Sequence, residues 1–381
     1  MSTIISPKYI HHDTSSKPTL CPFRIRVTSY LRQNSFSSWC AHHEDSCNLH
    51  QPCTVTASIA KDPGFRIQTA LLWIRSNESL RRRASSRLFS SENDRDSSEI
   101  ILNDAVQGVS PADPNVDVPE DKPDLGLLHL HRDRLAAAAE ALGWTTLDCL
   151  RHDDSALSIL KQAVEKYMAD LGPLPAATLE FRKVRILIAH TGEITVDSTI
   201  IGLNQPVSRT SLLTKQFVPD SFDEQPEADT PTCKILLDTQ PTRPSTLTTH
   251  KTLHRCMYNA ARERVQLQPT DPPTAKEVLL YNPYNEIMET SACTIYFNRD
   301  GSWITPAAIC GPSLGVTRRL AIEKGLCKQG TVENAEVRGG ENVWLSNAVR
   351  GFFRGVIVDG NEERSERSDV RLGCEQMRCG R

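Results

Sequence analysis

A glycine-flanked serine is the most obvious candidate for chemistry in this sequence. Gly311-Pro312-Ser313-Leu314-Gly315 has the form G-x-S-x-G and lies between an expected strand and an expected helix. In hydrolases with this motif, the acid and then the histidine base follow the serine in the chain. All 11 histidines precede Ser313, so no such triad can form in that order and a serine hydrolase is not expected.

The same loop has a second possible use, as a phosphate site. Gly315, Val316 and Thr317 open the expected helix. The first N–H groups of a helix have no partner within it, and the helix dipole favours an anion there. A plain glycine-rich turn is the alternative.

Three isolated ionisable residues are further candidates. Lys251 precedes a helical run, and Arg134 follows His131 in the first turn of an expected helix. Glu289 lies in an apolar strand expected over 287–297, where a carboxylate is costly unless it is paired. Each has an ordinary alternative: an exposed cation for Lys251 and Arg134, and a strand-edge position for Glu289.

Other large functional classes lack their sequence signals. The chain contains no G-x-G-x-x-G, no G-x-x-x-x-G-K-[ST] and no H-E-x-x-H motif, which removes the usual support for a nucleotide-binding protein or a zinc protease. A group of cysteines and histidines near the start lacks the paired C-x-x-C unit of a closed zinc site, so we expect no metal. Its members are Cys40, His42, His43, Cys47, His50 and Cys53.

Composition excludes further classes of partner. Among 381 residues, 44 are basic and 47 acidic, for a formal net charge of −3, and 6% are aromatic. No basic stretch is interleaved with aromatics, so no nucleic-acid partner is expected. No apolar run approaches the roughly 18 residues of a membrane span, so no membrane association is expected either.

The cysteine pattern and the composition of the first residues indicate possible cellular compartments. The 12 cysteines are irregularly spaced and follow no secretory leader, which favours a reducing compartment and a cytoplasmic protein. Residues 1–60 show no apolar periodicity and are expected to be irregular or disordered. Up to His43 they contain five basic residues and one acid, Asp13, which is also typical of a mitochondrial presequence.

The elements that must position the candidates form two lobes. In the first, 61–205, we expect a strand at 65–73, a helix at 135–142, a helix from Asp154 to Leu171 and a hairpin of 184–188 with 194–196. The tract 81–124 indicates a polar insertion, and 206–232 a linker. In the second, 233–360, we expect strands at 235–237, 278–281, 287–297, 303–305, 343–345 and 355–358, and a helix at 316–324. A polar tail, 361–381, follows. The sequence therefore predicts a two-lobed α+β protein.

In chain order, these candidates resemble the signature of the class IV, fold-type-IV, pyridoxal-phosphate enzymes. The matching segments are His131-Arg132-Asp133-Arg134-Leu135, His250-Lys251-Thr252 with Arg255 and Tyr258, Glu289-Thr290-Ser291, Ile304-Thr305-Pro306, Leu314-Gly315-Val316-Thr317-Arg318 and Leu345-Ser346-Asn347-Ala348-Val349. Roughly thirty residues separate Glu289 from Thr317, and Thr317 from Asn347, as in that family. The resemblance covers residues 65–358 and implies a D-amino-acid-aminotransferase-like fold.

The resemblance implies a role for each matching residue. Lys251 would form the Schiff base with pyridoxal 5'-phosphate and then move the α-proton. Glu289 would pair with the pyridine nitrogen and keep it protonated. The implied cofactor-binding residues are Arg134, Lys251, Glu289, Gly315, Val316, Thr317, Asn347 and Ala348.

Within this family the sequence looks most like fungal 4-amino-4-deoxychorismate lyases. The features that carry this likeness are the acidic insertion, the His-Lys-Thr sequence and the segment 344–351. The likeness implies a lyase of the folate route that forms 4-aminobenzoate and pyruvate. A threonine near the cofactor supplies a proton in those enzymes, and Thr69 is the matching catalytic candidate; a strand threonine without a special role is the alternative.

Two other functions stay open at this point. One is an aminotransferase of the branched-chain or D-amino-acid type on the same fold, and the other is a catalytically degenerate homologue. The family builds its pocket partly from a neighbouring chain, so the resemblance also implies a homodimer that acts on a small molecule.

Overall fold

The computed structural model describes most of the chain from residue 60 onward. The described residues are 60–76, 127–152, 154–175, 179–201, 219, 221–223, 232–268, 271 and 274–358, together with the backbone of 24–27. Most of the first 60 residues, with their cysteine and histidine group, lie outside the described residues. So do the insertion at 81–124, most of the linker and the tail at 361–381.

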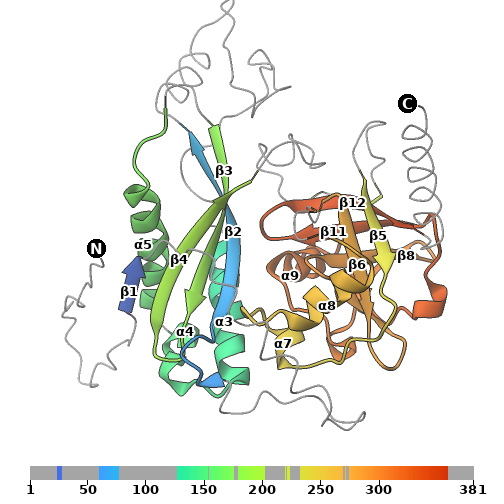
Figure 1. The fold of residues 1–381 in the computed structure, drawn as a ribbon, viewed down its shortest axis with the longest axis horizontal. Coiled ribbons are helices and arrows are strands. Elements are labelled where there is room, and N and C mark those ends of the chain that lie inside the picture. Colours follow the sequence, from blue (N-terminus) through green and yellow to red (C-terminus); the bar gives the residue numbers. More distant parts are fainter. Residues whose placement is uncertain are drawn as a thin grey trace, which may run out of the picture.

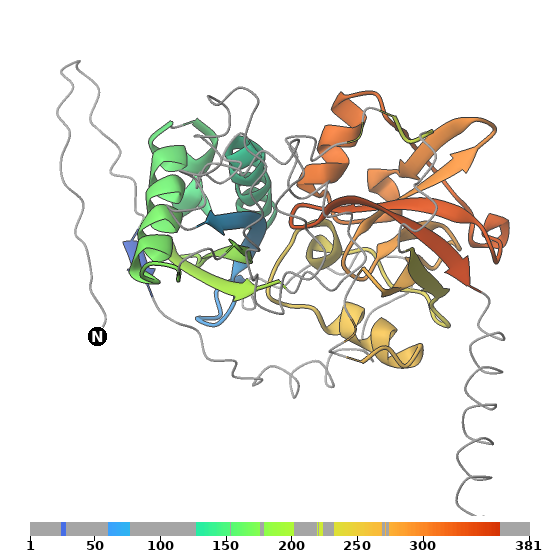
Figure 2. The ribbon, with the colours of Figure 1, turned by 90° about the horizontal axis from the view of Figure 1, so that it is seen from above.

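The described elements form two lobes that lie side by side in both ribbon views (Figures 1 and 2). The N-terminal lobe comprises residues 60–201 and the C-terminal lobe residues 232–358, and each contains its own sheet. Each lobe also has its own clusters of buried hydrophobic residues. The predicted two-lobed α+β architecture is confirmed.

The sheet of the N-terminal lobe has the strand order β1-β4-β3-β2. Its strands are β1 (Arg24–Val27), β2 (Ile67–Ser76), β3 (Leu179–Ile188) and β4 (Glu193–Ile200). β3 pairs antiparallel with β2 and β4, which confirms the predicted hairpin, and β1 is parallel to β4. Val184, Ile186 and Ile188 alternate along β3 and are fully buried, as expected when one face of a strand packs on a core. This order leaves β2 at one edge of the sheet.

Two helices, α3 (Leu128–Ala141) and α5 (Asp154–Asp170), complete that core, and η4 (Thr145–Leu147) and α4 (Cys149–His152) connect them. The apolar stripe of α5 is buried as predicted, except for Ile159, which is half-buried, and Leu171, which lies past the helix end and is 38% exposed. α3 starts earlier than predicted, because Leu128 and Leu130 are also buried and extend its apolar face. Arg134 therefore lies in the second turn of α3, and the first-turn prediction is wrong.

The sheet of the C-terminal lobe has the order β10-β9-β8-β11-β12-β5-β6-β7. Its strands are β5 (Cys233–Leu237), β6 (Lys276–Tyr281), β7 (Ile287–Thr290), β8 (Thr294–Arg299), β9 (Ser302–Pro306), β10 (Lys328–Gly330), β11 (Asn342–Asn347) and β12 (Gly351–Val358). The helices of this lobe are α7 (Thr246–Thr249), α8 (Cys256–Arg264) and α9 (Val316–Glu323), with short 3-10 turns η5 (Ala308–Cys310) and η6 (Asn334–Glu336).

The prediction of one strand over 287–297 is wrong, because a bend at residues 291–293 divides it into β7 and β8. The Thr290 hydroxyl accepts the N–H of Cys293 and donates to its carbonyl, both at 3.1 Å. The Ser291 hydroxyl donates to the buried Glu277 carboxylate at 2.8 Å. These bonds hold the bend, so β7 pairs with β6 while β8 pairs with β9 and β11. Glu289 therefore shares no continuous strand face with Ile295.

One residue of the expected linker belongs to the C-terminal core. Phe222 is fully buried, and its ring centroid lies 5.0 Å from that of Tyr296 and 5.2 Å from that of Trp344. The indole N–H of Trp344 donates to the carbonyl of Phe222 at 2.8 Å. The chain between the lobes is thus fixed to the C-terminal lobe at this point.

The two lobes meet through backbone as well as side chains. The N–H of Gln68 on edge strand β2 donates to the carbonyl of Lys251 (2.9 Å), and the N–H of Leu253 donates to the carbonyl of Arg66 (3.1 Å). The Gln68 amide also donates to the Thr252 carbonyl at 2.5 Å. Residues 251–253 therefore extend the edge of the N-terminal sheet and place Lys251 at the boundary between the lobes.

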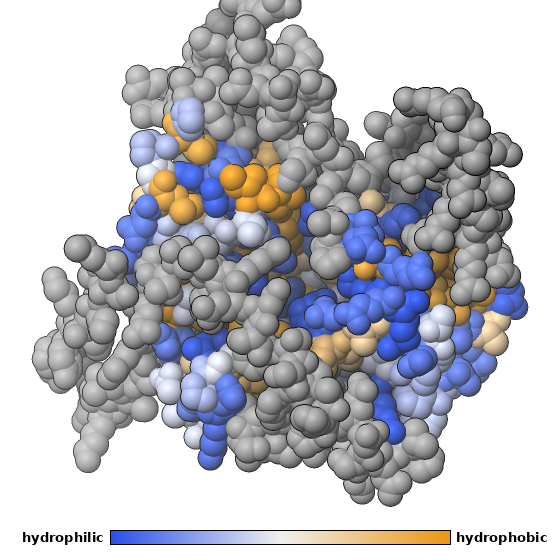
Figure 3. Space-filling view, viewed as in Figure 1, coloured by the Kyte–Doolittle hydropathy of each residue, from blue (hydrophilic) through white to orange (hydrophobic). Residues whose placement is uncertain are grey.

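The surface differs between the lobes. On the described part of the face in Figure 3, hydrophobic residues gather over the N-terminal lobe, whereas the C-terminal lobe is mainly hydrophilic. Within the described residues, every helix is too short or too polar to cross a bilayer.

Candidate active site

Lys251 lies in the segment that joins α7 to α8. The Ser245 hydroxyl caps α7 by accepting the N–H groups of Leu247 (3.2 Å) and Thr248 (3.3 Å), and this fixes where the helix begins. α7 ends at His250, whose backbone is extended (φ −113°, ψ 135°). Lys251 follows and is held against β2 through its carbonyl.

Burial and the neighbouring cations favour the neutral form of the Lys251 amine. Burial lowers its pKa well below the ordinary lysine value, and the nearby cations Arg134, Lys183 and Arg255 lower it further. Within the described part of the chain, the amine has no hydrogen-bond acceptor. A neutral, desolvated amine is the nucleophilic form of lysine and the form that accepts a proton.

Glu289 on β7 is a buried carboxylate with two donors on the same oxygen. The Tyr258 hydroxyl donates to Oε1 at 2.6 Å, and the Ser313 N–H donates to Oε1 at 2.9 Å. Burial raises the pKa of Glu289 to about 7, against the lowering effect of these bonds and of Arg134 and Arg255. Among the described residues Oε2 accepts no hydrogen bond, so it is open to a further donor.

Ser313 connects Glu289 to Arg134. Its N–H contacts Glu289, and its hydroxyl accepts a hydrogen bond from Nη2 of Arg134 at 2.7 Å. Gly311 begins the loop at φ +94°, where a Cβ would lie 2.5 Å from Pro244, so glycine is required for conformation and for space. The G-x-S-x-G motif thus has a positional role here, with no histidine after it.

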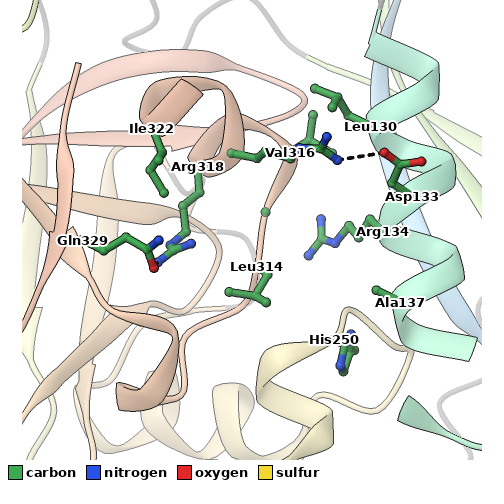
Figure 4. A pocket seen from close by; sticks show the side chains of 12 residues that line it. Leu130, Asp133, Arg134, Ala137, His250, Leu314, Val316, Arg318, Ile322 and Gln329 are labelled. Carbon is green, nitrogen blue, oxygen red and sulfur yellow. Dashed lines mark hydrogen bonds and ion pairs between the residues drawn. The ribbon is translucent and has the colours of Figure 1, made fainter. Parts of the chain in front are cut away.

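Arg134 points from α3 towards the loop that carries Leu314 (Figure 4). It lines a cavity of about 350 Å³, together with His250, Leu314, Gly315 and Val316. Burial lowers the pKa of Arg134 to about 10, so it remains a cation at neutral pH. Its Nε is buried and has no hydrogen-bond partner in the described structure.

The N terminus of α9 faces the same cavity. Gly315 is its N-cap residue, and no side chain caps the helix, which leaves first-turn N–H groups for an anion. Thr317 is fully buried, and its hydroxyl accepts a hydrogen bond from Ser346 at 2.9 Å. Its own hydrogen therefore remains available to another acceptor.

Asn347 ends β11 and organises the turn before β12. Its Oδ1 accepts the N–H groups of Val349 (3.0 Å) and Arg350 (2.9 Å), and its Nδ2 donates to Sγ of Cys293 (3.2 Å). Ala348 lies within the same turn. The carboxamide of Asn347 is therefore engaged in holding the turn, and the described contacts do not join it to Arg134.

Thr69 lies on β2, next to the residue that holds the Lys251 carbonyl. Its hydroxyl is 2.6 Å from Nδ1 of His131 on α3, and both residues are buried. Burial lowers the pKa of His131 to about 3, with further lowering by Arg134 and Lys251. The ring is therefore neutral, and Arg134 and Lys251 lie close enough to affect its pKa.

Lys183 and Arg255 lie near Lys251, and Arg350 lies near Lys183; we call Lys183, Arg255 and Arg350 the cationic group. Burial lowers the pKa of Lys183 to about 8, and Arg185, Arg255 and Arg350 lower it too, while Asp197 opposes them. The Asp197 carboxylate already accepts hydrogen bonds from Nε and Nη2 of Arg185. Asp197 opposes this charge near Lys183 and Glu277 opposes it near Arg350, and the three cations together would attract an anionic ligand.

These residues also fit the cofactor that the motifs imply. Arg134, with its partnerless Nε, and the uncapped α9 are suited to a phosphate. Glu289 Oε2 is suited to a protonated ring nitrogen, and the neutral Lys251 amine to an aldehyde. Among the described residues, His, Cys, Asp and Glu side chains do not gather in threes as a metal site would require.

Comparison with known proteins identifies the family. A match to the amino-transferase class IV family spans residues 123–356, more than half of the chain. The chain belongs to this family. Members of the amino-transferase class IV family depend on pyridoxal phosphate, so the match also confirms the predicted fold-type-IV class and an enzyme of the lyase or aminotransferase kind.

Two fungal proteins are similar in sequence to this class IV chain. The Schizosaccharomyces pombe protein named "Putative aminodeoxychorismate lyase" is 27% identical over 246 residues, which are 64% of this chain and 89% of that protein. The Saccharomyces cerevisiae aminodeoxychorismate lyase is 24% identical over 191 residues, which are 46% of this chain and 51% of that protein. The predicted likeness to fungal aminodeoxychorismate lyases is confirmed.

A solved structure of a Mesorhizobium loti protein, titled "Putative amino-acid aminotransferase", is 17% identical to this chain with a TM-score of 0.47. The similarity covers 77% of this chain and all of that protein.

Sequence reasoning missed three residues that the structure places at the site. Ser313 was recognised only as a nucleophile motif, and its spatial neighbours on α3 and β7 are far away in the chain. His131 marked the motif around Arg134 without a role of its own, and Lys183 lies in an ordinary strand. The alternation of β3 turns Lys183 away from the core residues Val184 and Ile186, a signal that was present in the sequence.

Proposed function

We propose that this chain is a pyridoxal-phosphate-dependent lyase that converts 4-amino-4-deoxychorismate to 4-aminobenzoate and pyruvate, a step of the folate route. The observation that carries the proposal is the linked set of Lys251, Glu289 and Arg134 around the loop at 313–315. The likeness to the two fungal proteins supports the choice of substrate.

The cofactor phosphate is assigned to Arg134 and α9. The guanidinium brings charge and an unused Nε–H, and the N–H groups of Val316 and Thr317 add the positive end of the helix. The Thr317 hydroxyl is oriented by Ser346, which donates to it. When bound, pyridoxal phosphate supplies an electron sink for the carbanion left by proton loss.

Glu289 is assigned to the ring nitrogen. Burial raises the pKa of Glu289 in spite of the nearby Arg134 and Arg255, and a protonated nitrogen next to Oε2 would restore its charged form. Tyr258 and Ser313 occupy Oε1 and so orient Oε2. The assigned task of Glu289 is to hold a proton on that nitrogen.

Two residues are assigned to proton movement. Lys251, as a neutral amine, takes the proton from the ring carbon that bears the substrate amine. Thr69 gives a proton to the departing enolpyruvyl oxygen when its bond to the ring breaks. The two electrons of that bond leave with the oxygen, and loss of the ring proton makes the six-membered ring aromatic.

The cationic group favours this substrate over a branched-chain amino acid. 4-Amino-4-deoxychorismate carries two carboxylates, one on the ring and one on the enolpyruvyl group, whereas a branched-chain amino acid carries one. Lys183 from β3 and Arg255 and Arg350 from the C-terminal lobe reach the same place from both lobes. Two carboxylates would neutralise this charge better than one.

The direct test uses purified full-length protein with pyridoxal phosphate and enzymatically generated 4-amino-4-deoxychorismate. We expect 4-aminobenzoate and pyruvate in equal amounts, with no 2-oxo acid added. An absorbance band at roughly 410–420 nm reports the lysine–cofactor bond. A protein that shows the band but forms product only with an added 2-oxo acid would be an aminotransferase; without band or product, it would be a degenerate homologue.

Assembly and location complete the proposal. We propose a homodimer in the cytoplasm, with a small molecule as its ligand and neither nucleic acid nor membrane as partner. The dimer rests on the class IV family and the location on the irregular cysteines. Sedimentation at several protein concentrations tests the dimer, and imaging of a C-terminally tagged full chain separates a cytoplasmic from a mitochondrial protein.

A further inference from the structure

A buried threonine–histidine pair lies beside the proposed site. Thr69 Oγ1 and His131 Nδ1 are 2.6 Å apart, on β2 and α3 respectively. Thr69 is fully buried and His131 is 2% exposed. Burial at this distance makes the hydrogen bond a fixed feature of the lobe, because either group alone would be costly to bury unpaired.

The pair is close to the groups that perform the proposed chemistry. Gln68, the neighbour of Thr69, donates to the Lys251 carbonyl, and His131 lies one helical turn before Arg134. Arg134 and Lys251 both lie near enough to His131 to lower the pKa of its ring. The pair therefore lies beside the residues to which the cofactor phosphate and the proton transfer are assigned.

Burial fixes the protonation state of the ring. His131 is neutral at physiological pH, because burial, followed by the nearby Arg134, lowers its pKa to about 3. A neutral imidazole has one N–H donor and one acceptor nitrogen. The bond to Thr69 therefore has two possible directions, and the tautomer of His131 decides which one forms.

We propose that His131 is a positioning residue for Thr69: its Nδ1–H donates to Thr69 Oγ1 and directs the threonine hydrogen towards the site between the lobes. This inference rests on the proposed lyase function. The Thr69 hydrogen passes to the enolpyruvyl oxygen as the carbon–oxygen bond breaks. Lys251, which holds the proton taken from the ring carbon, returns it to the Thr69 oxygen, so protons balance and the pair returns to its starting state.

Substitution of each partner, singly and together, tests the coupling. We expect Thr69→Val to lower kcat about 10²-fold, as for loss of a general acid, and His131→Leu to lower kcat about tenfold, with KM changed less than twofold. His131→Asn retains an N–H near the Nδ1 position and should recover most of the loss. The double variant Thr69→Val/His131→Leu should be no slower than Thr69→Val alone, since residues that act as a unit are non-additive.

A matched control comes from the same helix. His129 is exposed on α3, and His129→Asn should have wild-type kcat. Thermal unfolding of every variant shows whether its fold is retained. Multiplicative losses in the double variant, or equal losses for His131→Leu and His131→Asn at equal stability, would overturn the proposal.

A second readout does not depend on turnover. In protein labelled with ¹⁵N-histidine, the His131 signals, identified by their loss in His131→Asn, should show a protonated Nδ1 and an unprotonated Nε2. Thr69→Val should shift the Nδ1 signal, whereas Thr69→Ser should leave it in place. A protonated Nε2 with a bare Nδ1 would reverse the direction of the bond and refute the inference.

The two proposals fail in different ways. If the wild-type protein forms no 4-aminobenzoate while the histidine signals are as expected, the lyase function is wrong. The direction of the hydrogen bond from His131 to Thr69 is then correct, but it has no role in that reaction. If the wild-type protein is an active lyase and His131→Leu matches it, the lyase function holds and the positioning role is wrong.

Discussion

The two lobes contribute to the site in different ways. The C-terminal lobe supplies Lys251, Glu289 and Thr317 from short segments that bind one another locally, through Ser313 and Ser346. The N-terminal lobe supplies Arg134, Thr69 and Lys183 from a helix and two strands of one packed core. If the proposed function is correct, this difference predicts that the C-terminal lobe carries the covalent chemistry, while the N-terminal lobe adds the phosphate contact of Arg134, the proton donor Thr69 and part of the substrate site.

The largest expected effect is a difference in activity between variants of two half-buried lysines, one from each lobe. Lys251→Ala should abolish the absorbance band and lower turnover at least about 10³-fold, because both nucleophile and base are lost. Lys183→Ala should keep the band and raise KM, because its proposed role is to bind carboxylate. Absorbance spectra and steady-state kinetics of both variants check this; loss of the band in Lys183→Ala would contradict the division between the lobes.

The second prediction concerns the stability of the cofactor-free protein. Glu289 has a pKa raised from 4.5 to about 7, so as pH rises the unfolded state loses this proton before the folded state does. The free energy of unfolding should fall between pH 4.5 and 7 by up to about 3 kcal/mol and level off above pH 7.

Urea titrations at several pH values measure this slope. Glu289→Gln should remove this part of it, whereas Glu165→Gln, at an exposed site on α5, should keep the wild-type slope. Saturation with pyridoxal phosphate should flatten the slope of the wild type, because a protonated ring nitrogen stabilises the carboxylate. A slope that is the same in wild type and Glu289→Gln would show that this carboxylate ionises normally.

The third prediction tests the phosphate contact that crosses between the lobes. Arg134→Met should weaken pyridoxal-phosphate binding about 10- to 100-fold, equivalent to losing charge-assisted hydrogen bonds of about 1.5–3 kcal/mol. Arg132→Met, on the same helix but paired with Asp133, is the matched control. Spectroscopic titration gives both dissociation constants, and equal values would remove Arg134 from the phosphate site.

The smallest effect concerns Gln68, one of the side chains that join the lobes. Gln68→Leu removes the bond to the Thr252 carbonyl and should lower the free energy of unfolding by about 1–2 kcal/mol. Gln240→Leu, at an exposed position, should change stability little. An unaltered urea midpoint in Gln68→Leu would mean that water replaces the amide at no cost.

The lobes also differ in how far the sequence predicts them. In the C-terminal lobe the motif segments follow one another in family order, and α9 begins at Val316 as expected. The bend after Thr290 was not predictable, because apolar residues continue on both sides of it and the bonds that hold it involve Glu277 on another strand. Apolar periodicity indicates which residues are buried. The strands on both sides of the bend are buried, so periodicity gives no sign of the bend.

The site residues of the N-terminal lobe are less predictable from the sequence. The start of α3 was misplaced, because its first turn lacks an acidic residue and a capping side chain, the usual signals of a helix start. The bond between Thr69 and His131 joins residues 62 positions apart, and that between Arg134 and Ser313 joins residues 179 apart. The first pair depends on packing within the N-terminal lobe and the second on packing between the lobes, and local sequence pattern encodes neither.

Residues 251–253 pair with the edge of β2 through main-chain bonds, and such bonds tolerate changes of side chain. The two bonds use peptide groups only, so the reactive nitrogen stays in register whatever side chains occupy positions 66 and 253. Proline is the exception, since it has no N–H to give. Related sequences can therefore vary along this strand pairing without displacing Lys251, provided that neither position 68 nor position 253 is proline.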